Sequence, residues 1–531
     1  MPTNSEVIFQ EFKEHSISEF FKKNKQMLGY SSKLRSLVTI VHEYVTNSLD
    51  ACEEAGILPT LFITISKMDE EKYTVEVSDN GPGIPKKYIG KALAMILAGT
   101  KFHRNIQQRG QQGIGAAGCT LFAQVTSGRP ISVISSTQNE AYSCNIGIDT
   151  LQNKPIITDM QNLPVPTSTG LYIKGEFNYV KYDTGDHSVK EYLKRTALSN
   201  PHAEIHFKDP EGKEQIFTRA VNELPKRPSV AKLHPLGLIA NDLIEFAHSS
   251  SEKTLSNFFM NTFARFSKAK VDELKSILVG INFDNAPKDL TWDDAEKIVN
   301  AFKNIKWIIP DASHIIPIGE NQIYIALKNI LDPEYISVIE RKPKVFKGGF
   351  PFIVEAAIAY GGQAGKKNEE GSEGNILRFA NRVPLLFDSG NCAITEAIKS
   401  IQWKRYGIDL NNMPISILVN VSSVHIPYAG VGKESIAFED EIEDEIKLAV
   451  MDSARNLQHF LIGKERTKTY ANKYKFIMKY ADQLSTDLSQ LSNNDPEAIK
   501  AKLKEIVENK YKQSNEEETQ NVNNFPSNSN I

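Results

Sequence analysis

The sequence predicts an α+β protein built from several domains, and three observations support this. The chain has 531 residues, which is too long for one ordinary core at about 150 residues per domain. Hydrophobic residues make up 40% and charged residues 24% of the chain, as in globular proteins. Strand and helix patterns are mixed in two long stretches, and a stretch with helical patterns alone separates them.

Composition also excludes several classes of protein. The formal net charge is −3, so the chain as a whole lacks the basic balance of a nucleic-acid-binding protein. No stretch approaches the roughly 18 apolar residues of a membrane helix, and the N-terminus has no secretory signal pattern. We therefore expect a cytoplasmic protein that makes no membrane contact. The cysteines are too scattered for a zinc site or a disulfide framework: Cys52, Cys119, Cys144 and Cys392.

Residues 1–228 are predicted to form a first α+β domain, an expected sandwich of helices on a sheet. Alternating apolar residues mark four strands, at Leu61–Ile65, Tyr73–Ser78, Ile131–Ile134 and Gly170–Ile173. Closely spaced prolines then interrupt the pattern, and the first boundary is placed at Pro228.

Residues 229–308 are predicted to form a small helical insert. Helical patterns cover Leu255–Phe266 and Lys268–Leu278, and Thr291 has the spacing of a helix N-cap. This segment shows no strand pattern.

Residues 309–484 are predicted to form a second α+β domain that ends in a long helix. Strand patterns recur at Phe350–Glu355, Asn375–Phe379 and Ile415–Val421, and one helical pattern runs over Glu439–Leu484. Residues 485–531 are a polar tail. It holds one short helix that begins at Asp495-Pro496, and it is predicted to be disordered beyond Ser514.

Three motifs bear on chemistry, and the first lies in Val41–Ala51. Glu43, Asn47 and Asp50 are spaced so that they share one face of a helix. A carboxylate and an amide that project together can activate a water molecule and coordinate Mg²⁺. The opposite face should pack into a core, through Val38, Val41, Val45 and Leu49.

The second motif is a strand that ends in Asp79-Asn-Gly-Pro-Gly83. Its glycines permit a close approach of backbone to ligand, and the Asp79 carboxylate can accept a hydrogen bond from an exocyclic amine such as that of adenine. The third motif, Arg109–Gly118, is a glycine-rich loop before an apolar helix. Such a loop frees the first helical amides to bind phosphate.

Together, in this order and within about 75 residues, the three motifs resemble the Bergerat ATP-binding fold of the GHKL superfamily. The resemblance implies that Glu43 is the general base that orients the attacking water. It implies that Asn47 is the Mg²⁺ ligand and that Asp79 reads adenine. The phosphates of ATP would be held by Gly110, Gln111, Gln112, Gly113, Ile114, Gly115, Ala116 and Ala117.

The same resemblance assigns the residues around these motifs. Gly83 would lie behind the base, and Thr169 would help to hold adenine through water. Gly90–Arg109 resembles an ATP lid, in which Thr100 and Lys101 lie near the nucleotide.

Longer stretches are similar to the B-subunit family of DNA topoisomerase VI, the ATPase half of type IIB topoisomerases. They are Gly99–Gly115, Ala197–Ala203 and Arg378–Leu385. The resemblance extends to about Leu484. It implies that the helical insert is a helix-two-turns-helix domain and that the second α+β domain is a transducer. Lys433, in a Gly-Lys-x-Ser-Ile context, resembles the lysine that contacts the γ-phosphate and takes part in catalysis.

The family resemblance also implies partners. No Asp-x-Asp motif occurs in the chain, so the metal-dependent cleavage of DNA is expected on another polypeptide. In the family that polypeptide is the topoisomerase VI A subunit, in an A2B2 heterotetramer that passes one DNA duplex through another. The two ATPase chains dimerise when ATP binds, and the long C-terminal helix is the expected arm to the A subunit.

Three alternatives share the ATP-binding motifs. A histidine kinase would need a phosphoacceptor helix pair before Glu43, where the sequence leaves no room for one. A chaperone or mismatch-repair clamp would lack the helical insert. A nucleotide-regulated scaffold would bind ATP without hydrolysing it, and the presence of Glu43 argues against it. Short basic clusters such as Lys86-Lys87 are common on solvated surfaces, so no DNA-contacting residue is assigned.

Overall fold

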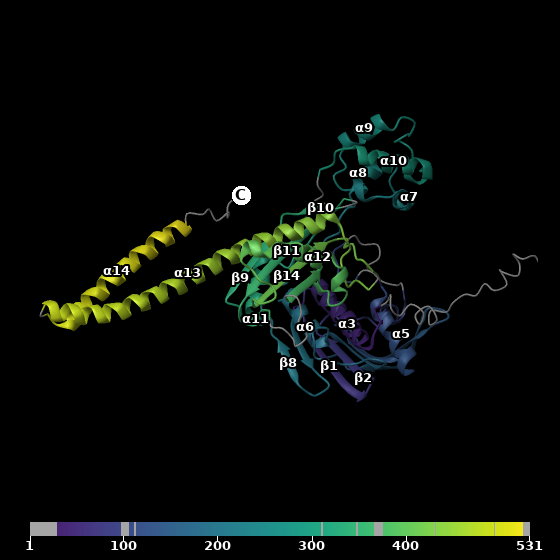
Figure 1. The fold of residues 1–531 in the computed structure, drawn as a ribbon. Coiled ribbons are helices and arrows are strands. Elements are labelled where there is room, and N and C mark those ends of the chain that lie inside the picture. The colour runs from purple at the N-terminus through teal and green to yellow at the C-terminus, as the bar shows by residue number, and fades with distance from the viewer. Residues whose placement is uncertain are drawn as a thin grey trace, which may run out of the picture. The chain divides into compact units, whose positions relative to one another are not determined.

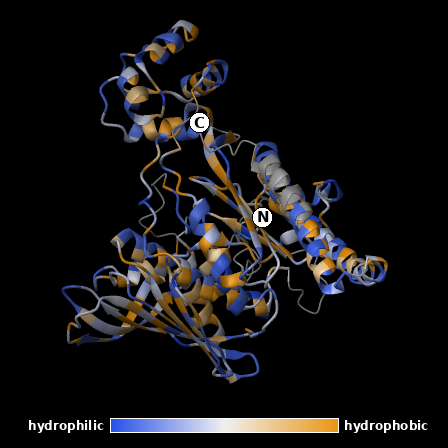
Figure 2. Cartoon of the chain, turned by 90° about the vertical axis from the view of Figure 1, so that its left-hand side faces the viewer, coloured by the Kyte–Doolittle hydropathy of each residue, from blue (hydrophilic) through white to orange (hydrophobic). Residues whose placement is uncertain are grey.

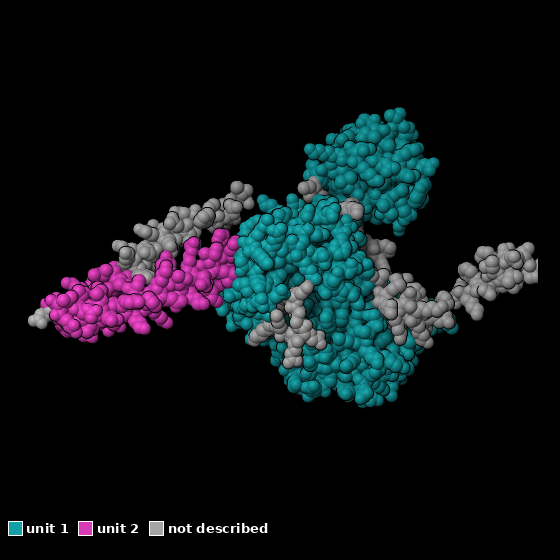
Figure 3. Space-filling view, viewed as in Figure 1, with its two compact units in different colours: residues 1–455 teal, residues 456–531 magenta. Residues whose placement is uncertain are grey.

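The computed structural model describes residues 29–96, 106–110, 113–308, 312–346, 349–365, 375–430, 432–492 and 494–523. Two compact units divide this chain, residues 1–455 and residues 456–531 (Figure 3). Within the first unit, two mixed sheets and a cluster of short helices follow one another along the sequence. None of the described helices is both long and apolar enough to span a membrane.

The first sheet has eight strands in the order β5-β4-β3-β6-β2-β1-β7-β8. The four predicted strands are present within β1, β2, β3 and β6, and the other four strands were not predicted. Of these, β5 is an edge strand whose residues are mostly exposed, so it lacks the apolar alternation that marks a buried strand. The strands are β1 (Thr60–Asp69), β2 (Lys72–Asp79), β3 (Ile131–Ser136), β4 (Ala141–Asp149), β5 (Lys154–Leu163), β6 (Gly170–Asn178), β7 (Glu204–Lys208) and β8 (Glu214–Phe217).

Helices cover one side of this sheet (Figure 1). The central one begins after Ser32, whose hydroxyl accepts a hydrogen bond from the Arg35 amide, and it ends at Gly56 in a left-handed conformation. As predicted, Val38, Val41, Val45 and Leu49 are buried in the core. The helices are α3 (Lys33–Ala55), α4 (Ile89–Ala94), α5 (Gly115–Ser127) and α6 (Val189–Ser199).

The helical insert has a core of its own, rich in phenylalanine, and its described residues form no strand between β8 and β9. Thr291 caps its last helix as predicted, because its hydroxyl accepts a hydrogen bond from the Asp294 amide. The elements are η1 (Pro235–Gly237), α7 (Ala240–Ser249), α8 (Leu255–Thr262), α9 (Lys268–Ile277), η2 (Pro287–Asp289) and α10 (Trp292–Asn304).

The second sheet is built on β11 and β14, which pair antiparallel and are almost fully buried. Long orange stretches on the strands in Figure 2 show the apolar residues that form this core. Strand β12 lies parallel to β14, so a crossover connects them. The elements are α11 (Glu320–Leu331), β9 (Tyr335–Glu340), β10 (Lys344–Phe346), β11 (Phe350–Tyr360), β12 (Asn375–Ala380), β13 (Val383–Pro384), η3 (Ser389–Asn391), α12 (Ala393–Lys399), η4 (Trp403–Tyr406) and β14 (Ile415–Ser423).

Two long helices end the chain, α13 (Asp440–Ser492) and α14 (Pro496–Asn523). The first is the predicted long helix and continues beyond Leu484. Within residues 456–531, the two helices are joined by an ion pair between Lys500 and Asp482, with an N–O distance of 2.9 Å. The prediction of disorder beyond Ser514 is wrong up to Asn523, because α14 continues through that polar segment. Its residues include good helix formers such as glutamate and glutamine.

Candidate functional site

A cavity of about 750 Å³ lies between α3, the end of β2, the start of α5 and the loop that follows β14. These elements are far apart in the sequence, and the folded chain places their polar residues around one space. The lining includes the predicted site residues Glu43, Asn47, Asp79, Gly83, Gly110, Gly113, Ile114, Gly115, Ala116, Ala117 and Lys433.

Helix α3 supplies the acidic and amide side chains of the cavity. The Asn47 amide nitrogen donates a 2.7 Å hydrogen bond to the Glu43 carbonyl, which fixes the orientation of the Asn47 side chain. Its Oδ1 atom lies 3.8 Å from the position of a Cβ added to Gly110, so it faces the glycine-rich loop. Asp50 does not belong to this group. It is buried one turn further along the helix and pairs with Arg109, so of the three residues on the predicted face only Glu43 and Asn47 line the cavity.

Asp79 ends β2 with its carboxylate held by three donors. The Ser48 hydroxyl donates to Oδ2 at 2.6 Å, and the Gly81 and Leu171 amides donate to Oδ1 at 2.9 and 3.3 Å. Burial raises the pKa of Asp79, and the three hydrogen bonds oppose that shift. A carboxylate held in this way is a fixed acceptor at the edge of the cavity, and the sequence analysis did not identify Ser48 as its support.

Gly83 occupies a position that no other residue fits without strain. Its φ is +68°, and a Cβ would lie 2.3 Å from the Ser136 carbonyl oxygen. The backbone can therefore approach β3 closely only at a glycine. Thr169 precedes Gly170, at which a Cβ would lie 2.3 Å from the Asp79 carbonyl oxygen. Thr169 is thus close in sequence to the site, but it is not among the residues that line the cavity.

The glycine-rich loop leads directly into α5, which begins at Gly115. The N-cap residue, Ile114, makes no side-chain capping hydrogen bond, so the first amides of the helix have no capping side chain. Free amides and the positive end of the helix dipole together favour an anion at this point. Gln111 and Gln112 lie outside the described residues, as do Thr100 and Lys101 of the predicted lid.

Lys433 enters the cavity from the second α+β domain. It lies in a tight turn in which its amide donates to the Gly430 carbonyl at 3.1 Å, and its φ is +53°. A non-glycine residue in the left-handed region is held there by its surroundings. The lysine therefore reaches the same cavity as Glu43 from a distant part of the chain.

The cavity also contains residues that the sequence analysis did not single out as site residues. His42 packs against Tyr192, with ring centroids 5.5 Å apart, and burial lowers its pKa, so its imidazole is neutral near pH 7. Lys91 of α4 adds a second lysine to the lining. No local motif marks His42 or Lys91, because each belongs to the site only through its position beside the cavity in the folded chain.

These features define a nucleotide-binding site of the GHKL ATPase class. A family model described as "Histidine kinase-, DNA gyrase B-, and HSP90-like ATPase" matches residues 32–147. A second, "Topoisomerase VI B subunit, transducer", matches residues 310–473. The chain belongs to the B-subunit family of DNA topoisomerase VI, and it is the ATP-binding subunit of a type IIB DNA topoisomerase.

Proteins similar in sequence support this assignment over the histidine kinase and chaperone alternatives. The B subunit of type 2 DNA topoisomerase 6 from Pyrococcus horikoshii is 43% identical over 549 residues, which cover 95% of this chain and 96% of that one. The protein of the same name from Methanothermobacter thermautotrophicus is 44% identical over 489 residues, covering 91% and 93%. Among solved structures, the ATPase region of Saccharomyces cerevisiae topoisomerase II matches with a TM-score of 0.41 and 11% identity, covering 86% of this chain and 99% of that one.

Proposed function

We propose that the chain is an ATP-operated clamp, in which ATP binding makes the first domains of two copies dimerise and so closes a gate around DNA. The observation that carries this proposal is the position of Lys433. It lies on the second α+β domain but lines the same cavity as Glu43, Asn47 and Asp79 of the first. A nucleotide bound there would contact both domains and could bias their arrangement, provided that it binds the closed dimer more tightly than the open state.

Within the cavity, Glu43 is proposed as the general base that orients the attacking water. Lys433 would place a positive charge at the γ-phosphate and so distinguish ATP from ADP. The free amides at the start of α5 would hold the phosphates, together with the rest of the loop Gly110–Ala117. Asp79 would accept a hydrogen bond from the adenine amino group, with Gly83 behind the base and Thr169 nearby.

Mg²⁺ is proposed as the metal, and Asn47 as its protein ligand. The Asn47 amide nitrogen is already bonded to the Glu43 carbonyl, so its oxygen is the atom that is turned toward the glycine-rich loop. An oxygen ligand next to a phosphate-binding loop suits Mg²⁺. This ion keeps several of its waters and takes its other ligands from a few protein groups and from the substrate phosphates. Bound Mg²⁺ would neutralise phosphate charge during hydrolysis.

A partner, the topoisomerase VI A subunit, is proposed to cleave the DNA. The relatives are named as the B component of their enzyme, and the sequence contains no Asp-x-Asp motif of the kind that cleavage would need. Two copies of each polypeptide would form an A2B2 heterotetramer that passes one double-stranded DNA through another, and α13 would reach the A subunit. Hydrolysis of ATP would then reopen the gate.

Hydrolysis and self-association of the purified chain test this proposal. With a non-hydrolysable ATP analogue, sedimentation should shift from monomer to dimer. Glu43→Ala should still dimerise with ATP but should hydrolyse it at least about 100-fold more slowly. Glu70→Ala, in the exposed turn between β1 and β2, is the matched control and should behave like the wild type. A chain that binds ATP without hydrolysing it would be a scaffold instead, and one that does not dimerise would contradict the clamp.

A further inference from the structure

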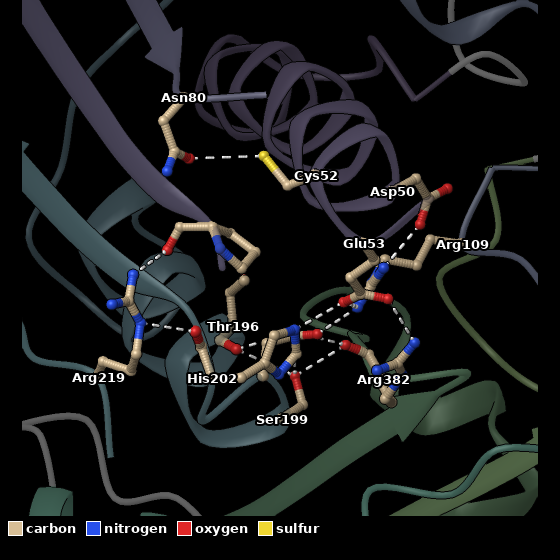
Figure 4. A network of polar contacts seen from close by, with 12 residues as sticks. Asp50, Cys52, Glu53, Asn80, Arg109, Thr196, Ser199, His202, Arg219 and Arg382 are labelled. Carbon is tan, nitrogen blue, oxygen red and sulfur yellow. Dashed lines mark hydrogen bonds and ion pairs between the residues drawn. The ribbon is translucent and has the colours of Figure 1, made fainter. Parts of the chain in front are cut away.

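A buried ionic network lies at the C-terminal end of α3 (Figure 4). Its centre is Glu53, in the last turn of α3. The Oε1 atom of Glu53 accepts a 2.6 Å hydrogen bond from Arg109, and Oε2 accepts a 2.9 Å hydrogen bond from Arg382. The side chains of Glu53, Arg109 and Arg382 are 10%, 2% and 8% exposed, so the three charges lie in a nearly dry space.

The two arginines belong to different parts of the molecule. Arg109 begins the glycine-rich loop and immediately precedes Gly110, the first of the residues proposed to hold the phosphates. Arg382 lies in the turn between β12 and β13 of the second α+β domain, 329 residues along the chain from Glu53. The Glu53 carboxylate therefore joins Arg109 to the second domain. Asn200 of the first domain makes a parallel link, since its Oδ1 accepts from Arg109 and its amide nitrogen donates to the Arg382 carbonyl.

Among the described residues, two carboxylates and two guanidinium groups form the ion pairs of this network. Asp50 pairs with Nη1 of Arg109 at 2.6 Å, so both terminal nitrogens of that guanidinium face carboxylates. Burial alone would raise the pKa of Glu53, but Arg109 and Arg382 hold it well below its usual value. His202 donates from Nε2 to Glu53 at 2.8 Å, and burial lowers its pKa, so it adds no charge near pH 7. Glu53 is thus ionised and makes both of its ion pairs.

Arg382 is held firmly at its end of the network. Its φ is +66°, in the left-handed region. Its carbonyl accepts hydrogen bonds from the Ser199 hydroxyl at 2.8 Å and from the Asn200 amide nitrogen at 3.1 Å. Its own amide donates to Asn420 of β14 at 3.2 Å. Ser199 and Asn200 belong to the first domain and Asn420 to the second, so the Arg382 backbone lies at the contact between the two domains.

A second contact ties the same loop to the second domain. The Gln107 side chain donates from Nε2 to the Ile316 carbonyl at 2.8 Å, and its Oε1 accepts from the Ile316 amide. Gln107 and Arg109 are both buried, with 4% and 6% exposure. The residues just before Gly110 are therefore attached to the second domain at two separate points.

We propose that Glu53 is a positioning residue that couples the glycine-rich loop to the second α+β domain, independently of Lys433. This proposal rests on the proposed function, in which Gly110–Ala117 holds the phosphates of ATP. A change in this loop between the ATP and ADP states moves Arg109, Glu53 passes the movement to Arg382, and the transducer responds. Lys433 contacts the γ-phosphate directly, whereas Glu53 acts only through Arg109.

The test compares Glu53→Gln with Asp50→Asn in the complex with the topoisomerase VI A subunit. Both variants remove one buried charge beside Arg109, but only Glu53→Gln breaks the ion pair with Arg382. Two quantities are measured, namely dimerisation driven by the ATP analogue and the number of DNA strand passages per ATP hydrolysed. For Glu53→Gln we expect analogue-driven dimerisation within about threefold of the wild type and strand passages per ATP lower by about tenfold. For Asp50→Asn we expect the passages per ATP to stay within about twofold of the wild type.

A double variant separates coupling from stability. Glu53→Gln with Arg382→Met removes both charges of one ion pair, so neither leaves the other unpaired, and the Asp50–Arg109 ion pair remains. Coupling through Glu53 predicts that this variant folds like the wild type and still has low passages per ATP. Two results would overturn the proposal. One is a double variant whose strand passages per ATP return to the wild-type value, and the other is a loss of strand passages per ATP in Asp50→Asn as large as that in Glu53→Gln. A wild-type chain that neither dimerises nor hydrolyses ATP would instead contradict the proposed function.

A structural readout completes the test. Spin labels at Glu70→Cys, in the first domain, and Asn411→Cys, in the second, report the distance between the two domains, since both positions are exposed and the four native cysteines are buried. The analogue should change this distance in the wild type and in Asp50→Asn. In Glu53→Gln the change should be lost. If the analogue changes the distance between the labels in Glu53→Gln as much as in the wild type, the proposal is overturned.

Discussion

The Glu43 carboxylate lies directly against Gly115. A Cβ added to Gly115 would stand 1.8 Å from Oε2 of Glu43, far inside any contact that side-chain atoms make. The first residue of α5 must therefore be a glycine if the proposed general base is to keep its position beside the glycine-rich loop.

Gly115→Ala should consequently lower ATP hydrolysis by about 100-fold, because Glu43 or the loop must shift by more than an ångström. Gly118→Ala, one turn later in the same helix, is the control. A Cβ there meets its nearest neighbour, the Tyr30 hydroxyl, at 3.7 Å, an ordinary contact. Steady-state hydrolysis of the two purified variants checks this, and equal rates for both would contradict the proximity argument.

Lys433→Met should weaken binding of a non-hydrolysable ATP analogue by at least about tenfold, since a charge-assisted contact with the γ-phosphate is lost. Affinity for ADP should change by less than about twofold, because ADP lacks that phosphate. Calorimetric titration of both ligands gives the comparison. Lys433→Arg keeps the charge and should retain part of the preference for ATP over ADP. If Lys433→Met lost affinity for the ATP analogue and for ADP equally, a role in sensing the γ-phosphate would be excluded.

Ser48→Ala should weaken nucleotide binding by about tenfold, because Asp79 loses the donor at its Oδ2 atom. That hydrogen bond opposes the upward shift of the Asp79 pKa caused by burial, so its removal raises the pKa further. The variant should then lose affinity at a higher pH than the wild type as the solution is acidified. Ser36→Ala is the control, since that buried hydroxyl on the same helix donates to the Ser32 carbonyl and is not in the cavity.

Glu355→Gln should change how stability depends on pH. Burial raises the pKa of Glu355 from 4.5 to about 7, so between these values the folded chain binds more protons than the unfolded chain. Its contribution to the free energy of unfolding is present below pH 4.5 and is lost as the pH rises through 7, a change of about 3 kcal/mol.

Since glutamine does not titrate, the destabilisation caused by Glu355→Gln should be largest at about pH 5 and smallest at about pH 8. Thermal unfolding of wild type and variant at both values measures this difference. A difference in stability that does not vary with pH would show that Glu355 is ionised throughout. The Ile318 and Gly319 amides and Asn420 donate to this carboxylate, and their hydrogen bonds oppose the shift.

Several features of the fold could be predicted from the sequence because they depend on residues close together in the chain. The apolar spacing of Val41, Val45 and Leu49 predicts the buried face of α3, and Thr291 marks the start of α10. Strands that are buried, such as β11 and β14, have continuous apolar runs. Strand β5 lacks such a signal, because its residues are mostly exposed and it has no buried apolar face that the sequence pattern could show.

Local motifs are enough to establish the chemistry that the chain can offer, since Glu43, Asn47, Asp79 and the glycine-rich loop all stand in them. The Gly-Lys-x-Ser-Ile context of Lys433 predicted its role, but the contacts that bring distant residues to this site are decided by the folded chain. Lys433 reaches the cavity, Ser48 supports Asp79, and Glu53 joins Arg109 to Arg382 across 329 residues. Such contacts need folding because a hydrogen bond or ion pair depends on the distance between its two groups and on their burial. Residues far apart in the chain become close and buried only when the two sheets and their helices have packed.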